Sequence, residues 1–83
     1  MLIKGNDVHD NVLWGGGSGL DIGTQAIIEG NDIHHNNVDD WGGGIVVADT
    51  IQPVTLTNNV ITRNKQDGLA GVNFRDFHLV NNT

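Results

Sequence analysis

Hydrophobic residues alternate with polar ones in short runs along the whole chain. Four of these runs end at a Gly-Asn or Asn-Asn pair, and none continues as the 3.6-residue stripe of an amphipathic helix. The alternating pairs are Met1 and Ile3, Ala26 and Ile28, Val54 and Leu56, and Phe77 and Leu79. Runs of period two that are bounded by Gly and Asn are typical of strands. The pattern therefore predicts an all-β chain of short strands.

One segment recurs along the chain. Residues 5–11 (GNDVHDN) and 30–36 (GNDIHHN) are nearly identical, residues 58–64 (NNVITRN) are a diverged copy, and residues 81–83 (NNT) are a truncated one. The second residue of each copy is asparagine, at spacings of 25, 28 and 23 positions. Repeats of this length indicate one supersecondary unit per repeat, stacked as a solenoid.

Each repeat has room for three short strands separated by turns, which predicts coils at about 1–25, 26–53 and 54–76 and a partial coil at 77–83. Strands in register from coil to coil would form three short parallel sheets around an aliphatic interior. The predicted inward columns are Ile3/Ile28/Leu56/Leu79, Val8/Ile33/Ile61 and Leu20/Ile45. In the third coil both Leu69 and Val72 fit the last column, and the distance from Asn64 favours Val72 and Phe74 facing inward.

The recurring asparagines have a physical reason. A sharp corner needs a residue at positive φ, which Gly and Asn tolerate best, and asparagine amides stacked about 4.8 Å apart can hydrogen-bond from coil to coil. The first predicted ladder is Asn6, Asn31, Asn59 and Asn82, and the second, at the next corner, is Asn11, Asn36 and Asn64.

This pattern of apolar residue, Gly/Asn-Asn, apolar residue and Asn resembles the right-handed parallel β-helix repeat over essentially the whole chain. That family includes pectate lyases, polygalacturonases, alginate epimerases, phage tailspikes and many surface proteins. The resemblance is specific for architecture, because the same repeat serves enzymes and inert stalks. It implies a parent protein that is secreted or lies on the cell surface.

The composition argues against several classes of partner and site. The formal net charge is −6, from four basic and ten acidic residues, which argues against nucleic-acid and anionic-membrane partners. There are no cysteines for a disulfide or a zinc-thiolate site. The sequence has no signal-peptide pattern and no apolar run of transmembrane length.

The residues that could form a glycan-binding surface come mainly from the segments around the two glycine runs. Trp14 and Trp41 precede equivalent GGG runs 27 positions apart, and indole faces suit the apolar faces of sugar rings. The full candidate set is Trp14, Trp41, Asp21, Asp39, Asp40 and Arg75. The paired acids could also hold Ca²⁺, although adjacent Asp residues are more often solvated turn residues.

A second candidate site is a metal site on an outward face. His9 and His34 are equivalent in the repeat, and so are Asp7 and Asp32, so all four side chains should meet on adjacent coils. Two imidazoles and two carboxylates could bind a transition metal. No other cofactor is expected.

Three functions fit these observations. The first is a segment of a carbohydrate-active or glycan-binding β-helix protein that is not catalytic by itself. The second is a structural or self-assembling repeat of a surface protein or adhesin. The third is a fragment of a polysaccharide lyase, glycoside hydrolase or uronate epimerase. The ends carry no capping element, so we also expect self-association through open ends.

Overall fold

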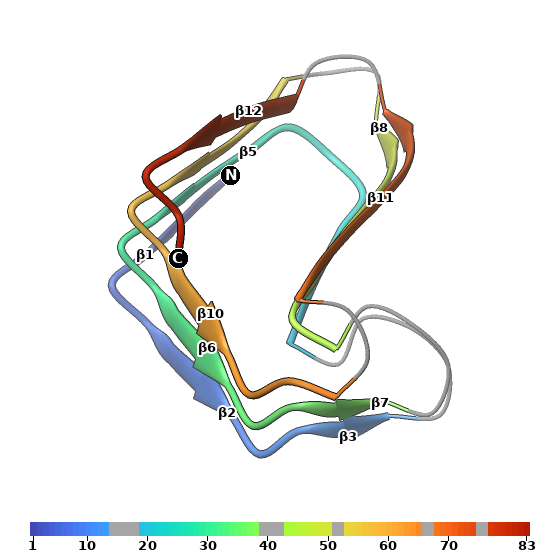
Figure 1. The fold of residues 1–83 in the computed structure, drawn as a ribbon. Helices are drawn as coiled ribbons and strands as arrows, with labels where there is room; N and C mark the ends of the chain where they lie inside the picture. Colours follow the sequence, from blue (N-terminus) through green and yellow to red (C-terminus); the bar gives the residue numbers. More distant parts are fainter. Residues whose placement is uncertain (14–18, 39–42, 51–52, 66–67, 75–76) are drawn as a thin grey trace.

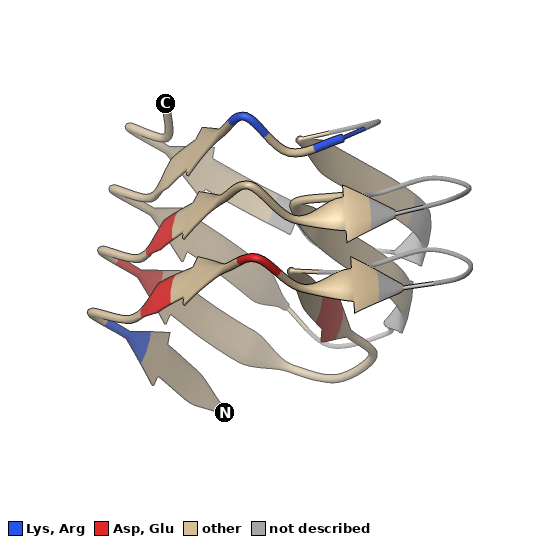
Figure 2. Cartoon of the chain, turned by 90° about the horizontal axis from the view of Figure 1, so that it is seen from below, with Lys and Arg blue, Asp and Glu red and all other residues tan. Residues whose placement is uncertain are grey.

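The computed structural model describes residues 1–13, 19–38, 43–50, 53–65, 68–74 and 77–83. The chain winds as a stack of coils, seen along the stack in Figure 1 and from the side in Figure 2, where the two termini lie at opposite ends. Every regular element of the described residues is a β-strand, as the period-two pattern predicts.

Three parallel sheets form the walls of the stack, and each takes one strand from successive coils. The first contains β1 (Leu2–Lys4), β5 (Ala26–Glu29), β9 (Val54–Thr57) and β12 (Phe77–Val80). The second contains β2 (Asp7–His9), β6 (Asp32–His34) and β10 (Val60–Thr62). The third contains β4 (Leu20–Ile22), β8 (Ile45–Thr50) and β11 (Leu69–Phe74).

A short fourth pairing, which the sequence pattern did not predict, joins two of the coils. It consists of β3 (Val12–Leu13) and β7 (Asn37–Val38), which pair in parallel directly after the second corner. Two residues are too few to show a period, and this explains why the alternation gave no sign of the pairing.

The interior is the predicted stack of aliphatic side chains. Ile3, Ile28, Leu56 and Leu79 align across the first sheet. Ile28 and Leu56 have no exposed surface, whereas Leu79, at the end of the stack, is 52% exposed. In the second sheet, Val8, Ile33 and Ile61 align in the same way. The apolar residues of an inner coil are therefore covered by the coils on either side of it.

The third sheet corrects one prediction. Leu69 lies opposite Ile45 and packs against the core, and Gly71 lies opposite Val47. Leu69 thus takes the place over Ile45, and the preference for Val72 at this place was wrong. The side chains of Val72 and Phe74 lie outside the described residues. Val72 lies opposite Ala48, one position out of the inward column.

A column of glycines ahead of the third sheet explains this register. The α-carbons of Gly19, Gly44 and Gly68 follow one another from coil to coil, and a β-carbon on Gly44 would collide with the carbonyl oxygen of Gly68. Ile45 N also donates to that oxygen, at 2.9 Å. The close approach requires glycine at position 44, and the hydrogen bond from Ile45 to Gly68 holds Leu69 over Ile45.

The asparagine ladders are confirmed at both corners. Asn6 Nδ2 donates to Asn31 Oδ1 at 3.1 Å, Asn31 Nδ2 to Asn59 Oδ1 at 3.0 Å, and Asn59 Nδ2 to Asn82 Oδ1 at 2.9 Å. In the second ladder, Asn11 Nδ2 donates to Asn36 Oδ1 and Asn36 Nδ2 to Asn64 Oδ1, both at 2.9 Å. The ladders satisfy amides that the fold buries.

Each ladder asparagine follows a residue at positive φ. At the first corner these residues are Gly5, Gly30, Asn58 and Asn81, as predicted from their tolerance of that conformation. At the second corner they are Asp10, His35 and Arg63, with φ of 57°, 54° and 54°. The second corner therefore forces three ordinary side chains into the left-handed region and fixes their direction.

Candidate functional site

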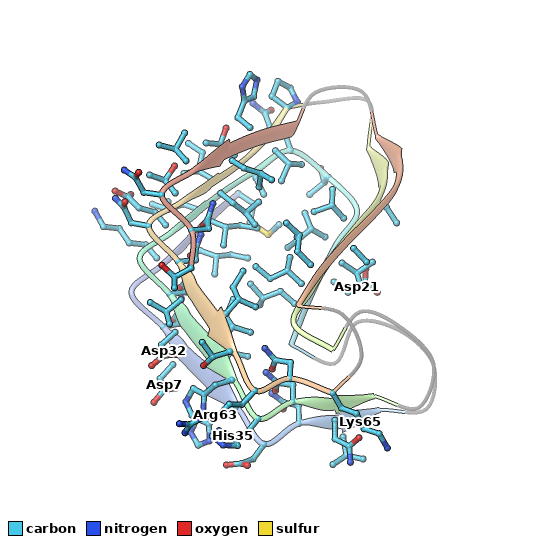
Figure 3. The ribbon with its side chains drawn as sticks, in the orientation of Figure 1. Asp7, Asp21, Asp32, His35, Arg63 and Lys65 are labelled. Atoms are coloured by element: carbon cyan, nitrogen blue, oxygen red, sulfur yellow. The ribbon has the colours of Figure 1, made fainter. Side chains whose placement is uncertain are left out.

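The outward face of β2 and β6 carries the candidate site. Val8 and Ile33 face the core, so the residues on either side of them face solvent. The register places Asp7 beside Asp32 and His9 beside His34. The four predicted residues therefore form an array of two rows, one per strand, with Asp7 and Asp32 side by side in Figure 3.

His34 is the centre of this array. Its Nε2 lies 2.7 Å from Asp7 Oδ1 on the neighbouring coil. Its Nδ1 lies 2.7 Å from Nδ1 of His35, and the two rings meet edge to face with centroids 4.9 Å apart. The His34 side chain is only 23% exposed. These contacts hold both ring nitrogens of His34 in fixed directions.

Three ligand atoms converge beside this ring. One atom from each of Asp7, Asp32 and His34 lies within 4.8 Å of the other two. His9, the fourth predicted ligand, stacks on the His34 ring instead, with centroids 5.1 Å apart and an interplanar angle of 6°. The structure therefore brings together three of the four residues of the predicted metal site.

His9 forms a hydrogen bond with Asp10, the next residue of the chain. Its Nδ1 lies 2.6 Å from Asp10 Oδ2. The hydrogen bond to Asp10 is the main reason that the pKa of His9 is raised, and the nearby Asp7 carboxylate adds to it. The same hydrogen bond lowers the pKa of Asp10. Asp10 and His9 thus form an exposed pair that favours the charged state of each partner.

Although the sequence places His35 directly after His34, the predicted site did not include Asp10 or His35. Both precede a ladder asparagine at the second corner, and both have positive φ. That backbone turns each side chain back towards the histidine before it. The only signal in the sequence was their position one residue before Asn11 and Asn36, which resembles that of Gly5 and Gly30 before the first ladder.

The array is confined to the first two coils. In the third coil Val60 takes the place of the aspartates and Thr62 that of the histidines. The corner residue there is Arg63, one position after Thr62. The paired acid and imidazole side chains therefore belong to coils one and two and do not run along the stack.

The predicted glycan surface is described only at Asp21. This residue lies on β4, is exposed, and sits on a different side of the coil from Asp7 and Asp32 (Figure 3). Trp14, Trp41, Asp39, Asp40 and Arg75 lie outside the described residues. The glycan surface, and Ca²⁺ at the paired acids, stay predictions. No helix long and apolar enough to cross a membrane occurs in the described part of the chain.

Comparison with known proteins agrees with the architecture. The model of the family described as right handed beta helix region matches residues 1–83. No curated protein and no solved structure matches the chain. The match covers every coil and agrees with the stacked parallel sheets, which the two asparagine ladders join from coil to coil. The chain therefore belongs to the right-handed beta helix region family.

Proposed function

We propose that this chain is a structural β-helix segment that binds further coils at its ends, with a second copy of the chain as the partner. The first asparagine ladder carries the proposal, because the open donors of Asn82 match the donors of Asn6 that Asn31 Oδ1 accepts, so Asn82 can take the place of the partner's Asn6. Two further features, the apolar ends and the register of the last segment, support it.

The open groups lie at Asn6 and Asn82. Asn31 Oδ1 accepts from both N and Nδ2 of Asn6, at 2.9 and 3.1 Å, but Asn6 Oδ1 has no donor among the described residues. Asn82 Nδ2 donates to Leu56 O at 2.9 Å, and within the described residues its second amide hydrogen and its backbone N–H have no acceptor. These are the groups through which each inner asparagine joins the next coil. A further asparagine beyond Asn82 would satisfy both donors.

The ends of the core are also open. Leu79 and Met1 are 52% and 57% exposed, although the residues of the inner coils at the same columns are buried. β1 and β12 are the outer strands of the first sheet. Exposed strand edges with apolar residues behind them are templates for pairing with another chain.

The register specifies how a second copy would fit. Leu79 aligns with Leu56 and, through it, with Ile3, so residues 77–83 are the structural equivalents of residues 1–7. β12 lies one layer above β9, whereas β10 and β11 are the outer strands of their own sheets. If β1 of a second copy is displaced, three other strands of that copy can pair with this one. Its β2 would pair with β10, its β4 with β11 and its β5 with β12. The pairing is therefore a strand exchange, in which residues 77–83 replace residues 1–7 of the partner.

Sedimentation velocity over a range of concentrations tests this proposal. We expect the chain to associate, and Leu79→Asp to weaken the association, because the aspartate would enter the shared apolar column. Ile27→Asp is the matched control, since Ile27 is 50% exposed on the outward face of the same sheet. A folded monomer at all concentrations, verified by far-UV circular dichroism, contradicts the proposal.

Deletion of residues 1–5 separates strand exchange from simple end-to-end stacking. Exchange predicts that the deletion strengthens association, because β5 of each copy is then open to β12 of another. Stacking on β1 predicts a loss of association instead. Deletion of residues 77–83 should abolish association by exchange. Simple stacking predicts that association persists, because β9, β10 and β11 then end in one layer that matches β1, β2 and β4 of a second copy.

Glycan binding is the second candidate. The observation that favours it is the direct pairing of β4 with β8, because a WGGG run lies shortly before each of these strands in the sequence. Affinity gel electrophoresis with acidic and neutral polysaccharides tests it: we expect retardation that Trp41→Ala removes. Retardation by none of them contradicts glycan binding. A fragment of a lyase would instead release unsaturated uronides, which absorb in the ultraviolet.

A further inference from the structure

The geometry points to a binding site for a divalent first-row transition ion, formed by Asp7, Asp32 and His34 and bridging the first two coils. Zn²⁺ is the representative ion. The site lies on the outward face of the second sheet. It belongs to the unexchanged chain, because an exchange of residues 1–7 would displace Asp7.

The backbone already places the three ligands. Asp32 and His34 are two residues apart on β6 and face the same side, and Asp7 is the register neighbour of Asp32 on β2. Their ligand atoms lie within 4.8 Å of one another. Zinc bonds of about 2.0–2.2 Å place neighbouring ligand atoms roughly 3.3–3.5 Å apart. The His34–Asp7 contact of 2.7 Å would open slightly and the aspartates, which are exposed, would close by side-chain rotation alone.

His35 supplies the partner that a metal-bound imidazole needs. A histidine that binds a metal through Nε2 carries its proton on Nδ1 and almost always donates it to a neighbour, which fixes the ring. His34 Nδ1 already lies 2.7 Å from His35 Nδ1, so it can donate to the His35 lone pair when Nε2 binds the ion. The positive φ of His35 holds that acceptor in place.

The charges favour a cation of this class. Asp7 and Asp32 lie directly opposite each other on paired strands, where like charges are unfavourable, and a dication would remove the repulsion. A neutral imidazole in the set selects ions such as Zn²⁺ over Ca²⁺, which prefers an all-oxygen shell of six to eight ligands. With three protein ligands, water or another ligand would complete the shell.

Isothermal titration of the chelator-treated chain with ZnCl₂ is the first test. We expect one Zn²⁺ per chain, weaker binding of CaCl₂, and an affinity that falls by about tenfold or more in Asp32→Asn and His34→Ala. Asp21→Asn is the matched control, because Asp21 is an exposed strand aspartate on another sheet, and its affinity should equal that of the unaltered chain. Unchanged affinity in His34→Ala or Asp32→Asn overturns the site.

Histidine ¹⁵N NMR is the second test, because it reports on individual ring nitrogens. On addition of Zn²⁺, we expect the Nε2 signal of His34 to shift and its Nδ1 to be protonated. His35→Gly keeps a residue that tolerates positive φ but removes the acceptor, and it should weaken Zn²⁺ binding by about tenfold. Zn²⁺-dependent shifts confined to His9 or His78 would contradict the assignment.

Discussion

The two copies of the recurring segment, residues 5–11 and 30–36, contain inward and outward positions, and only the inward positions keep their residue types in the third coil. The inward set, represented by Ile33 and Asn36, continues into the third coil as Ile61 and Asn64. The outward set, which holds Asp32 and His34, ends there, with Val60 and Thr62 in its place. A solenoid interior demands the same residue types in every coil, because each coil packs only on its neighbours. The outward face has no such demand, so a cluster confined to two coils is free to serve another purpose.

The largest effect that tests this comparison should come from the apolar column. Ile33 has no exposed surface, and Ile33→Ala should lower the free energy of unfolding by about 3–4 kcal/mol, since coils on both sides line the cavity. Val60→Ala changes a side chain that is 42% exposed and should stay within about 0.5 kcal/mol. Urea unfolding followed by circular dichroism measures both. Equal losses in the two variants would break the comparison.

The second largest effect on stability should come from the first asparagine ladder. Asn59→Ala removes the acceptor of Asn31 N and Nδ2, each at 3.0 Å, and both groups are buried. We expect a loss of about 3 kcal/mol in unfolding free energy, because unsatisfied buried donors keep their full desolvation cost. Asn58→Gly at the adjacent exposed position, where φ is 56°, is the control and should change stability by only about 0.5 kcal/mol. A ladder variant as stable as its control would show that the amides are dispensable.

The outward aspartates should matter little for stability without metal. Asp32→Asn removes one of two like charges that face each other, so we expect an unfolding free energy within about 0.5 kcal/mol of the unaltered chain, with any change stabilising. Urea unfolding in the presence of a chelator measures it. A marked destabilisation would mean that the outward array holds the coils together, as the inward columns do.

The smallest effect should come from the exposed pair of His9 and Asp10. His9 has a raised pKa, so its contribution to stability is complete below the pKa of the unfolded chain and is lost as pH rises through the folded value. Asp10 has a lowered pKa, so its contribution is present above the unfolded value and is lost as pH falls through the folded value.

An NMR titration of the histidine ring protons tests this pair. Asp10→Asn should lower the pKa of His9, because it removes the main hydrogen bond to the charged ring. Asp21→Asn, on another sheet, should leave that pKa unchanged. If Asp10→Asn does not lower it, the short contact between the two side chains does not persist in solution.

The sequence by itself determined the repeat, the strands and the residues of the interior. Period-two alternation and asparagines at fixed spacing are one-dimensional signals, and the columns of Ile28 and Ile33 and both ladders follow from them. The register of the third coil could not be predicted in this way. The choice between Leu69 and Val72 depends on which glycine of the third coil approaches Gly44, and the contact of Gly44 with the carbonyl oxygen of Gly68 places Leu69 over Ile45.

Only the tertiary structure decided which outward atoms meet. Alternation places Asp7, His9, Asp32 and His34 on one face, but it gives no side-chain directions and no backbone angle at a corner. At one corner the positive φ of Asp10 places its carboxylate against His9. At the same corner of the next coil His35, also at positive φ, contacts His34, which lies beside both aspartates. Inward positions are fixed by burial, which a pattern of residue types records. Outward positions are fixed by corner geometry and contacts between coils, which no single repeat contains.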